Sequence, residues 1–270
     1  MSKFLSSEQQ QSYRDNGFLF PVTVMSDAVA AQHRNRLEGI EAERGPMHYR
    51  VKPYLLMTSA YEIATHPVLL DAVESILGPD ILLWDSSYVI KEPNSGGFIS
   101  WHQDLTYWGL DMQSEYDLVS AWVALTPVTT SNGCMQFIRG SHKNGRYRHE
   151  DTFAEDNLLH RGQSIADNFS ADQIDYVELE AGQASLHQGW AVHSSTANES
   201  DDRRIGLVMN YLKPNVQQVV GNYEAATLVR GEDKFGYYVS EPVCETDFAA
   251  ANCEFQLTIE QKKRDVYDNA

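Results

Sequence analysis

The segment LVSAWVALTP, residues 118–127, shows the pattern that decides the fold of this chain. Its apolar side chains fall on every second residue, with Ser120, Trp122 and Ala124 between them. Successive side chains of a strand point to opposite faces, so the alternation predicts a strand that is buried on one face and largely covered on the other. From Ile81 onward, similar runs separated by Gly, Pro, Asn and Ser predict further short strands. The expected strands lie near residues 81–91, 98–102, 118–127, 134–138, 175–179, 184–187, 190–194 and 204–212.

The first 80 residues carry helix signals instead of this alternation. Proline is well placed in the first turn of a helix, and glycine can take the left-handed conformation that ends one. These signals predict three helices: from Ser6 or Ser7 to Asn16, from Ser26 or Asp27 to Arg44, and from Pro67 to Leu77. We therefore expect a mainly β protein, a barrel or sandwich, with a helical N-terminal layer. The chain is expected to be one domain, 1–270, with the helical layer at about 1–80, the barrel at about 81–215 and a C-terminal extension at about 216–270.

Composition excludes several classes of protein. The 270 residues are 42% hydrophobic and carry a net charge of −17, which opposes binding to the phosphates of nucleic acid. No apolar run reaches the roughly 18 residues that a membrane helix needs. Residues 1–11 lack the apolar core of a secretion signal, so a cytoplasmic location is expected. The three cysteines, Cys134, Cys244 and Cys253, form no CxxC pair and are expected to be reduced thiols.

The segment Trp101-His102-Gln103-Asp104 places an imidazole and a carboxylate two residues apart at the end of an expected strand. His193 closes another expected strand and could supply a third ligand. Two imidazoles and one carboxylate form the facial triad of non-heme Fe(II) enzymes, which leaves open positions for a 2-oxo acid and O2. A lone HxD pair is common on surfaces, and a lone histidine is usually a packed one. The HxD pair together with His193, and with Arg204 eleven residues after it, is much less common by chance than either feature alone.

Three segments resemble the phytanoyl-CoA dioxygenase family of iron- and 2-oxoglutarate-dependent oxygenases. They are WHQDLTYWGL (101–110), AWVALTPVTTSNGCMQFIRGSH (121–142) and HSSTANESDDRR (193–204). The opening SSEQQQSYRDNGFLF (6–20) is similar to the N-terminal helix and glycine of that family. The resemblance runs from about residue 5 to about residue 215. It implies a double-stranded β-helix, the jelly roll or cupin-like barrel, flanked by helices.

The resemblance also implies roles for individual residues. His102, Asp104 and His193 would hold Fe(II), and Arg204 would bind the C5 carboxylate of 2-oxoglutarate. Arginine suits this role because its planar fork pairs with a carboxylate through two hydrogen bonds. The neighbouring Arg203 could compete, but adjacent residues of a strand point to opposite faces and the family spacing favours Arg204.

Two further residues are implied to hold the cosubstrate: Ser195, two residues after the distal histidine, and Trp108, an aromatic wall of the pocket. His187 is the main alternative to His193 as the third ligand. The family places an asparagine five residues after the ligand, and Asn198 fits His193, whereas Val192 stands at that distance from His187. We therefore interpret His187 as structural, lining the site at most.

The implied reaction is hydroxylation of an unactivated C–H bond of a small molecule, with 2-oxoglutarate and O2 converted to succinate and CO2. Halogenating relatives replace the carboxylate ligand with Gly or Ala, so Asp104 argues against halogenation. One alternative is a barrel that binds a small molecule without catalysis. Another is a zinc or manganese protein with a non-oxidative reaction, which would have no use for Arg204.

The stretch from residue 143 to residue 172 is polar and lacks periodicity, which is typical of a long loop or a lid. We expect His149 and His160 to be solvated there and His142, in a turn motif, to be structural. Side chains expected to face the substrate are Tyr88, Gln103, Tyr107, Arg146 and Tyr147.

Overall fold

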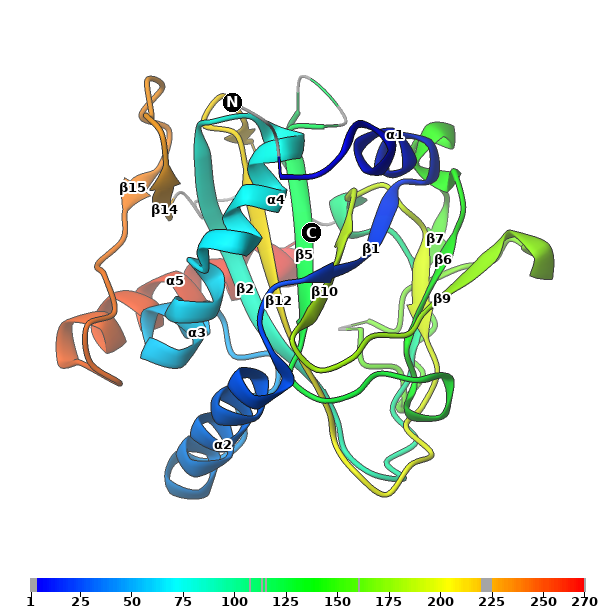
Figure 1. The fold of residues 1–270 in the computed structure, drawn as a ribbon, viewed down its shortest axis with the longest axis horizontal. Coiled ribbons are helices and arrows are strands. Elements are labelled where there is room, and N and C mark those ends of the chain that lie inside the picture. The colour runs from blue at the N-terminus through cyan, green and yellow to red at the C-terminus, as the bar shows by residue number, and fades with distance from the viewer. Residues whose placement is uncertain are drawn as a thin grey trace.

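Two β-sheets enclose the candidate site in the computed structural model, which describes residues 4–106, 108–112, 114, 116–159, 161–219 and 225–269 (Figure 1). In these residues the larger sheet has seven strands in the order β1 (Phe18–Thr23), β10 (Gln183–His187), β5 (Leu118–Ala124), β12 (Arg204–Leu212), β2 (Ile81–Lys91), β14 (Ala225–Arg230) and β15 (Val239–Ser240). The smaller sheet has the order β3 (Ile99–His102), β11 (His193–Ser195), β6 (Met135–Ile138) and β9 (Ile174–Val177). Two short pairs complete the strands: β4 (Leu110–Asp111) with β13 (Gln217–Gln218), and β7 (His149–Glu150) with β8 (Ser164–Ile165).

The mainly β architecture with flanking helices confirms the predicted fold class. Seven of the eight expected strands are present, and those at 81–91 and 204–212 match from end to end. The strand expected at 190–194 is misplaced, because residues 190–192 are not part of a strand and β11 begins only at His193. The strands at 81–91 and 204–212 pair antiparallel from Arg204 opposite Lys91 to Leu212 opposite Leu82, with one shift of register between Asn210 and Tyr211. These two strands and β5 form the centre of the larger sheet. The alternating segment 118–127 therefore lies in the core, as its pattern predicted.

Three expected helices are also present, and one expectation needs correction. They are α1 (Ser7–Asn16), α2 (Asp27–Arg44) and α4 (Pro67–Leu77). The N-terminal layer is not purely helical, because the apolar segment after Gly17 is strand β1, which pairs with β10 at the edge of the larger sheet. Two helices were not predicted: α3 (Thr58–Ala64), which has no side-chain cap, and α5 (Ala250–Asn269), which lacks a clear apolar stripe.

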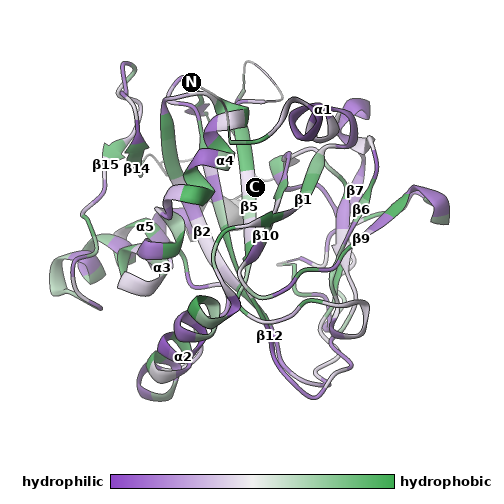
Figure 2. Cartoon of the chain, viewed as in Figure 1, coloured by the Kyte–Doolittle hydropathy of each residue, from purple (hydrophilic) through white to green (hydrophobic). Residues whose placement is uncertain are grey.

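The helices cover the sheet from outside. Helix α4 lies across the larger sheet and buries Leu69, Leu70 and Val73 against it (Figure 1). Figure 2 shows apolar residues concentrated on the central strands, whereas α1 and α2 are largely hydrophilic. The outer face of the sheet and these helices form the main hydrophobic core, which leaves the inner face available for the site.

A buried ion pair ties the C-terminal part of the chain to this core. Lys52 and Glu241 are in contact, and neither side chain is exposed. Tyr54 and Thr227 each donate a hydrogen bond of 2.7 Å to the same carboxylate. Helix α5 is held nearby by Asn252, whose side chain donates to the carbonyl of Leu55 at 3.0 Å. The C-terminal helix is thus fixed against the chain near Leu55.

The first prediction concerns this pair. Glu241→Ala should lower the free energy of unfolding by about 3 to 5 kcal/mol, because it leaves the Lys52 ammonium buried without a partner. Denaturant unfolding monitored by circular dichroism measures the change. Glu245→Ala, at an exposed position of the same segment, is the control and should stay within about 0.5 kcal/mol of the parent. Equal effects of the two substitutions would contradict the anchoring role.

Two expectations about chain chemistry are tested directly. Cys134, Cys244 and Cys253 are all unpaired, as the sequence predicted. Among the described residues, no helix combines the length and the apolar character that crossing a membrane requires.

Candidate metal centre

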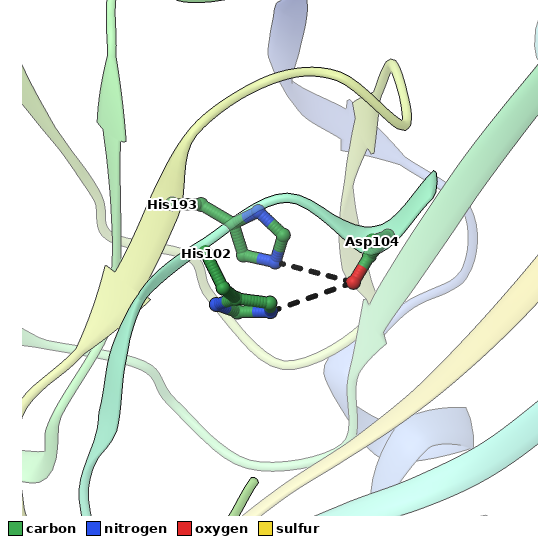
Figure 3. Close-up of side chains that lie close together, drawn as sticks. All are labelled: His102, Asp104 and His193. Atoms are coloured by element: carbon green, nitrogen blue, oxygen red, sulfur yellow. Dashed lines mark ion pairs between the residues drawn. The ribbon is translucent and has the colours of Figure 1, made fainter. Parts of the chain in front are cut away.

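Two histidines and one aspartate converge where the smaller sheet meets the cavity. His102 is the last residue of β3 and His193 the first of β11, and the antiparallel pairing of these strands places the two directly opposite each other. Their ring centroids are 4.1 Å apart. Asp104 follows at the start of a 3-10 helix (Asp104–Thr106), which turns its carboxylate back toward both rings (Figure 3).

The geometry suits a metal ion. The Asp104 Oδ1 atom lies 3.4 Å from Nε2 of His102 and 3.9 Å from Nε2 of His193. One ligand atom from each of the three residues lies within 4.8 Å of the others. Each Nδ1 atom faces a backbone carbonyl, that of Ser100 at 2.9 Å for His102 and that of Ala191 at 3.0 Å for His193. Donation to these carbonyls fixes the tautomer and leaves both Nε2 lone pairs facing the carboxylate, as metal-binding histidines require.

Electrostatics keep His193 and Asp104 in the form that binds a metal. Burial, and then the neighbouring His102, lower the pKa of His193 to about 3, so its imidazole is neutral. Burial acts to raise the pKa of Asp104, but His193, His102 and His187 outweigh it and hold that pKa well below its usual range. Neutral imidazole and ionised carboxylate are the ligand forms. The donor set fits a 2-His-1-carboxylate centre, the arrangement of non-heme Fe(II) oxygenases.

His187 contacts the other oxygen of the same carboxylate. It ends strand β10 of the larger sheet, is buried, and places Nε2 at 3.5 Å from Asp104 Oδ2. The two carboxylate oxygens therefore face different partners: Oδ1 faces His102 and His193, and Oδ2 faces His187. His187 lines the site, as one of the sequence interpretations allowed, and its position is that of a residue that orients Asp104.

The second prediction tests this orienting contact. His187→Leu removes the group facing Oδ2, so Asp104 is free to rotate, and metal affinity should fall by about 10- to 100-fold, as is typical when a partner of a metal ligand is lost. His187→Gln keeps a hydrogen-bond donor and should retain most of the affinity. Anaerobic Fe(II) titration followed by calorimetry measures both. An unchanged affinity in His187→Leu, or equal losses in both variants, would contradict the role.

Arg204 lies in the wall of the same cavity and is only 1% exposed. It begins β12, and its Nη1 atom donates to the carbonyl of Gly133 at 2.5 Å, while its Nε atom has no hydrogen-bond partner in the described part of the chain. The guanidinium lies 5.1 Å from the ring centroid of Trp122. Arg203 points outward instead and pairs with Glu92 at 2.7 Å. The two arginines therefore take the opposite faces that strand alternation predicted.

No carboxylate among the described residues pairs with Arg204. Lys91, directly opposite on β2, is also buried and donates to the carbonyls of Ser195 and Thr196. Burial lowers the pKa of Arg204 to about 10. Burial and then Arg204 lower the pKa of Lys91 to about 6. A buried cation without a counter-charge is costly, so this end of the cavity is suited to bind an anion.

The aromatic ring beside Arg204 belongs to Trp122. Trp108 also lines the cavity, but its ring packs edge-on against Trp84, with centroids 5.6 Å apart. Gly206 explains how Trp122 fits, because a Cβ atom at that glycine would lie 1.8 Å from the indole ring. The alternation of residues 118–127 put Trp122 on the partly polar face of its strand, but no motif pointed to it. Ser195 lines the same region, and its buried hydroxyl has no partner among the described residues.

Several side chains expected to face the substrate do not. Tyr88 is fully buried in the main core, because its strand presents Ser87 and Val89 to the cavity and position 88 to the opposite face. Gln103 is buried as well and donates to the carbonyls of Gly145 and Trp190. Arg146 and Tyr147 are not among the residues that line the cavity. Tyr107 and His160 lie outside the described residues.

Two further histidines of the described chain have structural contacts. His142 is buried and bonds the carbonyl of Arg14 at 3.0 Å, in agreement with the structural role expected. His149 is not solvated as expected, because it is half-buried and its Nε2 accepts the backbone N–H of Gln103 at 3.0 Å. It therefore supports the backbone between the two ligands of the HxD pair.

The cavity itself has a volume of about 580 Å³, within the range that holds a small ligand. The metal ligands and Arg204 line one part of it. Leu158, Leu159 and Gln163 line it from the long polar stretch 143–172, so that stretch covers the site.

The third prediction is that this stretch moves when ligands bind. Residues 143–172 should become more resistant to limited proteolysis when iron, 2-oxoglutarate and substrate are bound, because closing loops sequester a reaction from water. Mass spectrometry of the fragments locates the cuts. Equal cleavage rates with and without ligands would count against a lid.

A jelly roll with two buried histidines, a partly buried aspartate beside them and a buried arginine defines the class of non-heme iron- and 2-oxoglutarate-dependent oxygenases. The chain belongs to the phytanoyl-CoA dioxygenase family, whose sequence profile matches residues 13–206. It is 25% identical over 240 residues to the peroxisomal phytanoyl-CoA dioxygenase of Bos taurus, an alignment that covers 80% of this chain and 71% of that one.

Solved structures agree with this assignment. The structure described as the non-heme monooxygenase ThoJ, in its apo form, matches with a TM-score of 0.85 and 32% identity, over 97% of this chain and 98% of that one. CytC3, solved with Fe(II) and alpha-ketoglutarate, matches with a TM-score of 0.69 and 20% identity over 92% of this chain and 98% of that one. The second likeness shows the fold alone.

Proposed function

We propose that this protein hydroxylates an unactivated C–H bond of a small molecule, with 2-oxoglutarate and O2 as cosubstrates and succinate and CO2 as products. The observation that carries the proposal is the buried Arg204, which lacks a carboxylate partner in the described structure and lines the same cavity as the His-Asp-His cluster. An anion that binds both a metal ion and this arginine would satisfy both sites at once. 2-Oxoglutarate has a 2-oxo acid at one end and a carboxylate at the other.

In this proposal His102, Asp104 and His193 hold Fe(II), which with its cosubstrates supplies an oxidant able to break a C–H bond. Arg204 binds the distal carboxylate of 2-oxoglutarate through charge-assisted hydrogen bonds, and its unpartnered Nε supports this role. Ser195 contributes a hydroxyl to the same anion. The ring of Trp122 covers the guanidinium and excludes water from it, which strengthens the pairing.

Two observations favour this function over the alternatives. The carboxylate ligand Asp104 is retained, which argues against halogenation. A non-oxidative zinc or manganese barrel, or a barrel that only binds a ligand, would share the three metal ligands but would leave Arg204 buried without a purpose. A buried cation of this kind is expensive to keep in a fold, so a function that uses it is preferred.

The test has two stages. Anaerobic protein supplied with Fe(II) and 2-oxoglutarate should develop the weak visible charge-transfer band of the chelated 2-oxo acid. Succinate release is then measured against a library of small metabolites in the presence of O2. Absence of the band with iron bound would refute the 2-oxoglutarate role, and succinate release without an oxidised product would leave hydroxylation unsupported.

A further inference from the structure

A second buried basic side chain lies beside Arg204. Lys91 ends strand β2 and stands opposite Arg204, the first residue of β12, in the antiparallel pair of these strands. Residues directly opposite in a sheet point to the same face, so both side chains are turned toward the face on which Arg204 lines the cavity. Each is 1% exposed. Two basic side chains are therefore removed from solvent next to each other.

The Lys91 side chain fastens the backbone that leads from the metal ligand to Arg204. Its Nζ atom donates to the carbonyl of Ser195 at 3.2 Å and to that of Thr196. Ser195 ends β11, two residues after His193, and lines the cavity with a hydroxyl that has no partner among the described residues. Lys91 thus holds the backbone that presents this hydroxyl to the cavity.

Gly133 connects these carbonyls to Arg204. A Cβ atom at position 133 would lie 2.2 Å from the carbonyl oxygen of Thr196, so the two backbone segments are in direct contact. The carbonyl of Gly133 accepts from Nη1 of Arg204 at 2.5 Å. A continuous set of contacts therefore joins the Lys91 side chain to the Arg204 guanidinium, and a change at the lysine reaches the arginine.

Neither basic group has a carboxylate to balance it. The ion pairs of the described residues include neither Lys91 nor Arg204. Glu92, the residue after Lys91, pairs with Arg203 on the outer face. Two buried like charges repel each other, and an amine can lose its proton near neutral pH whereas a guanidinium cannot. Lys91 is therefore the group whose charge adapts to what lies beside Arg204.

The pKa values of the surrounding groups support this division. Burial, and then the neighbouring Arg204, lower the pKa of Lys91 to about 6. Burial and then Arg204 lower the pKa of His48 to about 4, whereas burial raises that of Cys134 to about 11. Loss of solvent around its hydroxyl raises the pKa of Tyr49 to about 12. Of these groups, Lys91 is the one whose charge can change near neutral pH.

We propose that Lys91 is a positioning residue of the cosubstrate site, which takes up a proton when a distal carboxylate binds Arg204 and so selects 2-oxo acids that carry one. The charge of the carboxylate favours the ammonium over the amine, and by reciprocity the ammonium favours the carboxylate to the same degree. Affinity for such an acid is then highest below the pKa of the free lysine and declines as the pH rises toward the higher pKa of the complex. This inference rests on the proposed function for the identity of the cosubstrate.

The experiment compares 2-oxoglutarate with 2-oxopentanoate, which has a 2-oxo acid chain of the same length but no distal carboxylate. Both are titrated by calorimetry into the anaerobic Fe(II) protein, in HEPES and in Tris, because the difference in heat between the buffers gives the number of protons bound. Near neutral pH, 2-oxoglutarate should take up as much as about one proton more than 2-oxopentanoate. The preference for 2-oxoglutarate should fall about 10-fold from about pH 6.5 to about pH 8.5, because a pKa difference of about one corresponds to a tenfold change in affinity.

Two variants of Lys91 test the charge itself. Lys91→Met cannot ionise and should lose the additional proton and about 10-fold of the preference near neutral pH, with Fe(II) affinity unchanged. Lys91→Gln keeps a hydrogen-bond donor for the carbonyl of Ser195 but also cannot ionise, so it should show the same losses.

Asn198→Ala is the matched control for a purely structural effect. The Asn198 side chain fastens the same loop by donating to the carbonyls of Lys91 at 3.0 Å and Asp202 at 2.8 Å, but it carries no charge. Its loss should weaken both acids alike and leave the difference in proton uptake intact.

Equal proton uptake for the two acids in the parent protein would overturn the inference, and this measurement decides the matter even if the Lys91 variants do not fold. Equal loss of both acids in Lys91→Met would reduce the lysine to a structural role. The two proposals fail differently. If neither acid binds to the Fe(II) protein, the 2-oxoglutarate role is refuted and the inference with it, whereas binding of both acids with equal proton uptake refutes the inference alone.

Discussion

Replacing His193 by alanine is expected to abolish stoichiometric Fe(II) binding, and with it the charge-transfer band and all succinate release. The reason is the geometry: His102, Asp104 and His193 each turn one ligand atom to a common point, and two ligands cannot hold Fe(II) on one face as three do. Iron content after desalting and the anaerobic spectrum with 2-oxoglutarate measure the loss.

His187 supplies the comparison for this result. It lies as close to Asp104 as the two proposed ligands do, but it faces the other carboxylate oxygen and comes from the opposite sheet. If iron and the band survive His193→Ala while His187→Ala removes them, the third ligand has been assigned wrongly. The folded state is checked by circular dichroism in each variant, so that loss of metal is not confused with loss of structure.

Arg204→Ala is expected to weaken 2-oxoglutarate binding severely and leave Fe(II) content unchanged. A charge-assisted hydrogen bond to a carboxylate contributes on the order of 1.5 to 3 kcal/mol, or about 10- to 150-fold in affinity. Arg204→Lys keeps a charge but loses the planar fork, so its loss should be partial. Titration of 2-oxoglutarate into the anaerobic Fe(II) protein measures the dissociation constants.

The neighbouring arginine is the control for this second result. Arg203 has the same side chain one residue away, but it pairs with Glu92 and Glu41 on the outer face. Arg203→Ala should therefore leave the affinity for 2-oxoglutarate nearly unchanged. An unchanged dissociation constant in Arg204→Ala would remove the cosubstrate role, and with it the strongest reason to regard this chain as a 2-oxoglutarate enzyme.

Local sequence was sufficient for much of the fold and for the candidate ligands. Period-two alternation depends only on the geometry of a single strand, so the strands at 81–91 and 204–212 were predicted from end to end. Alternation also separated Arg204 from Arg203. The HxD pair could be recognised because both of its members lie on one short segment at the end of a strand. Capping and glycine signals located α1, α2 and α4 in the same local way.

Elements without a local pattern were missed or misjudged. The segment after Gly17 has apolar residues but no sign of its pairing partner, and β1 is a strand because β10 lies beside it. Helix α5 has weak apolar periodicity, so its helical state depends on contacts such as those of Asn252 with the chain near Leu55. Tyr88 and Gln103 were expected in the cavity, but strand parity and a loop contact direct them elsewhere.

The sequence by itself determined that this chain forms a β-rich fold with flanking helices, and which histidines, aspartate and arginine were worth testing together. Only the tertiary structure decided which side chains surround them. Trp122 meets Arg204, His187 meets Asp104, and Lys263 meets Asp85 across a separation of 178 residues. The physical reason is that alternation fixes only the face to which a side chain points. The order and register of strands, and the docking of α5, decide what lies opposite that face.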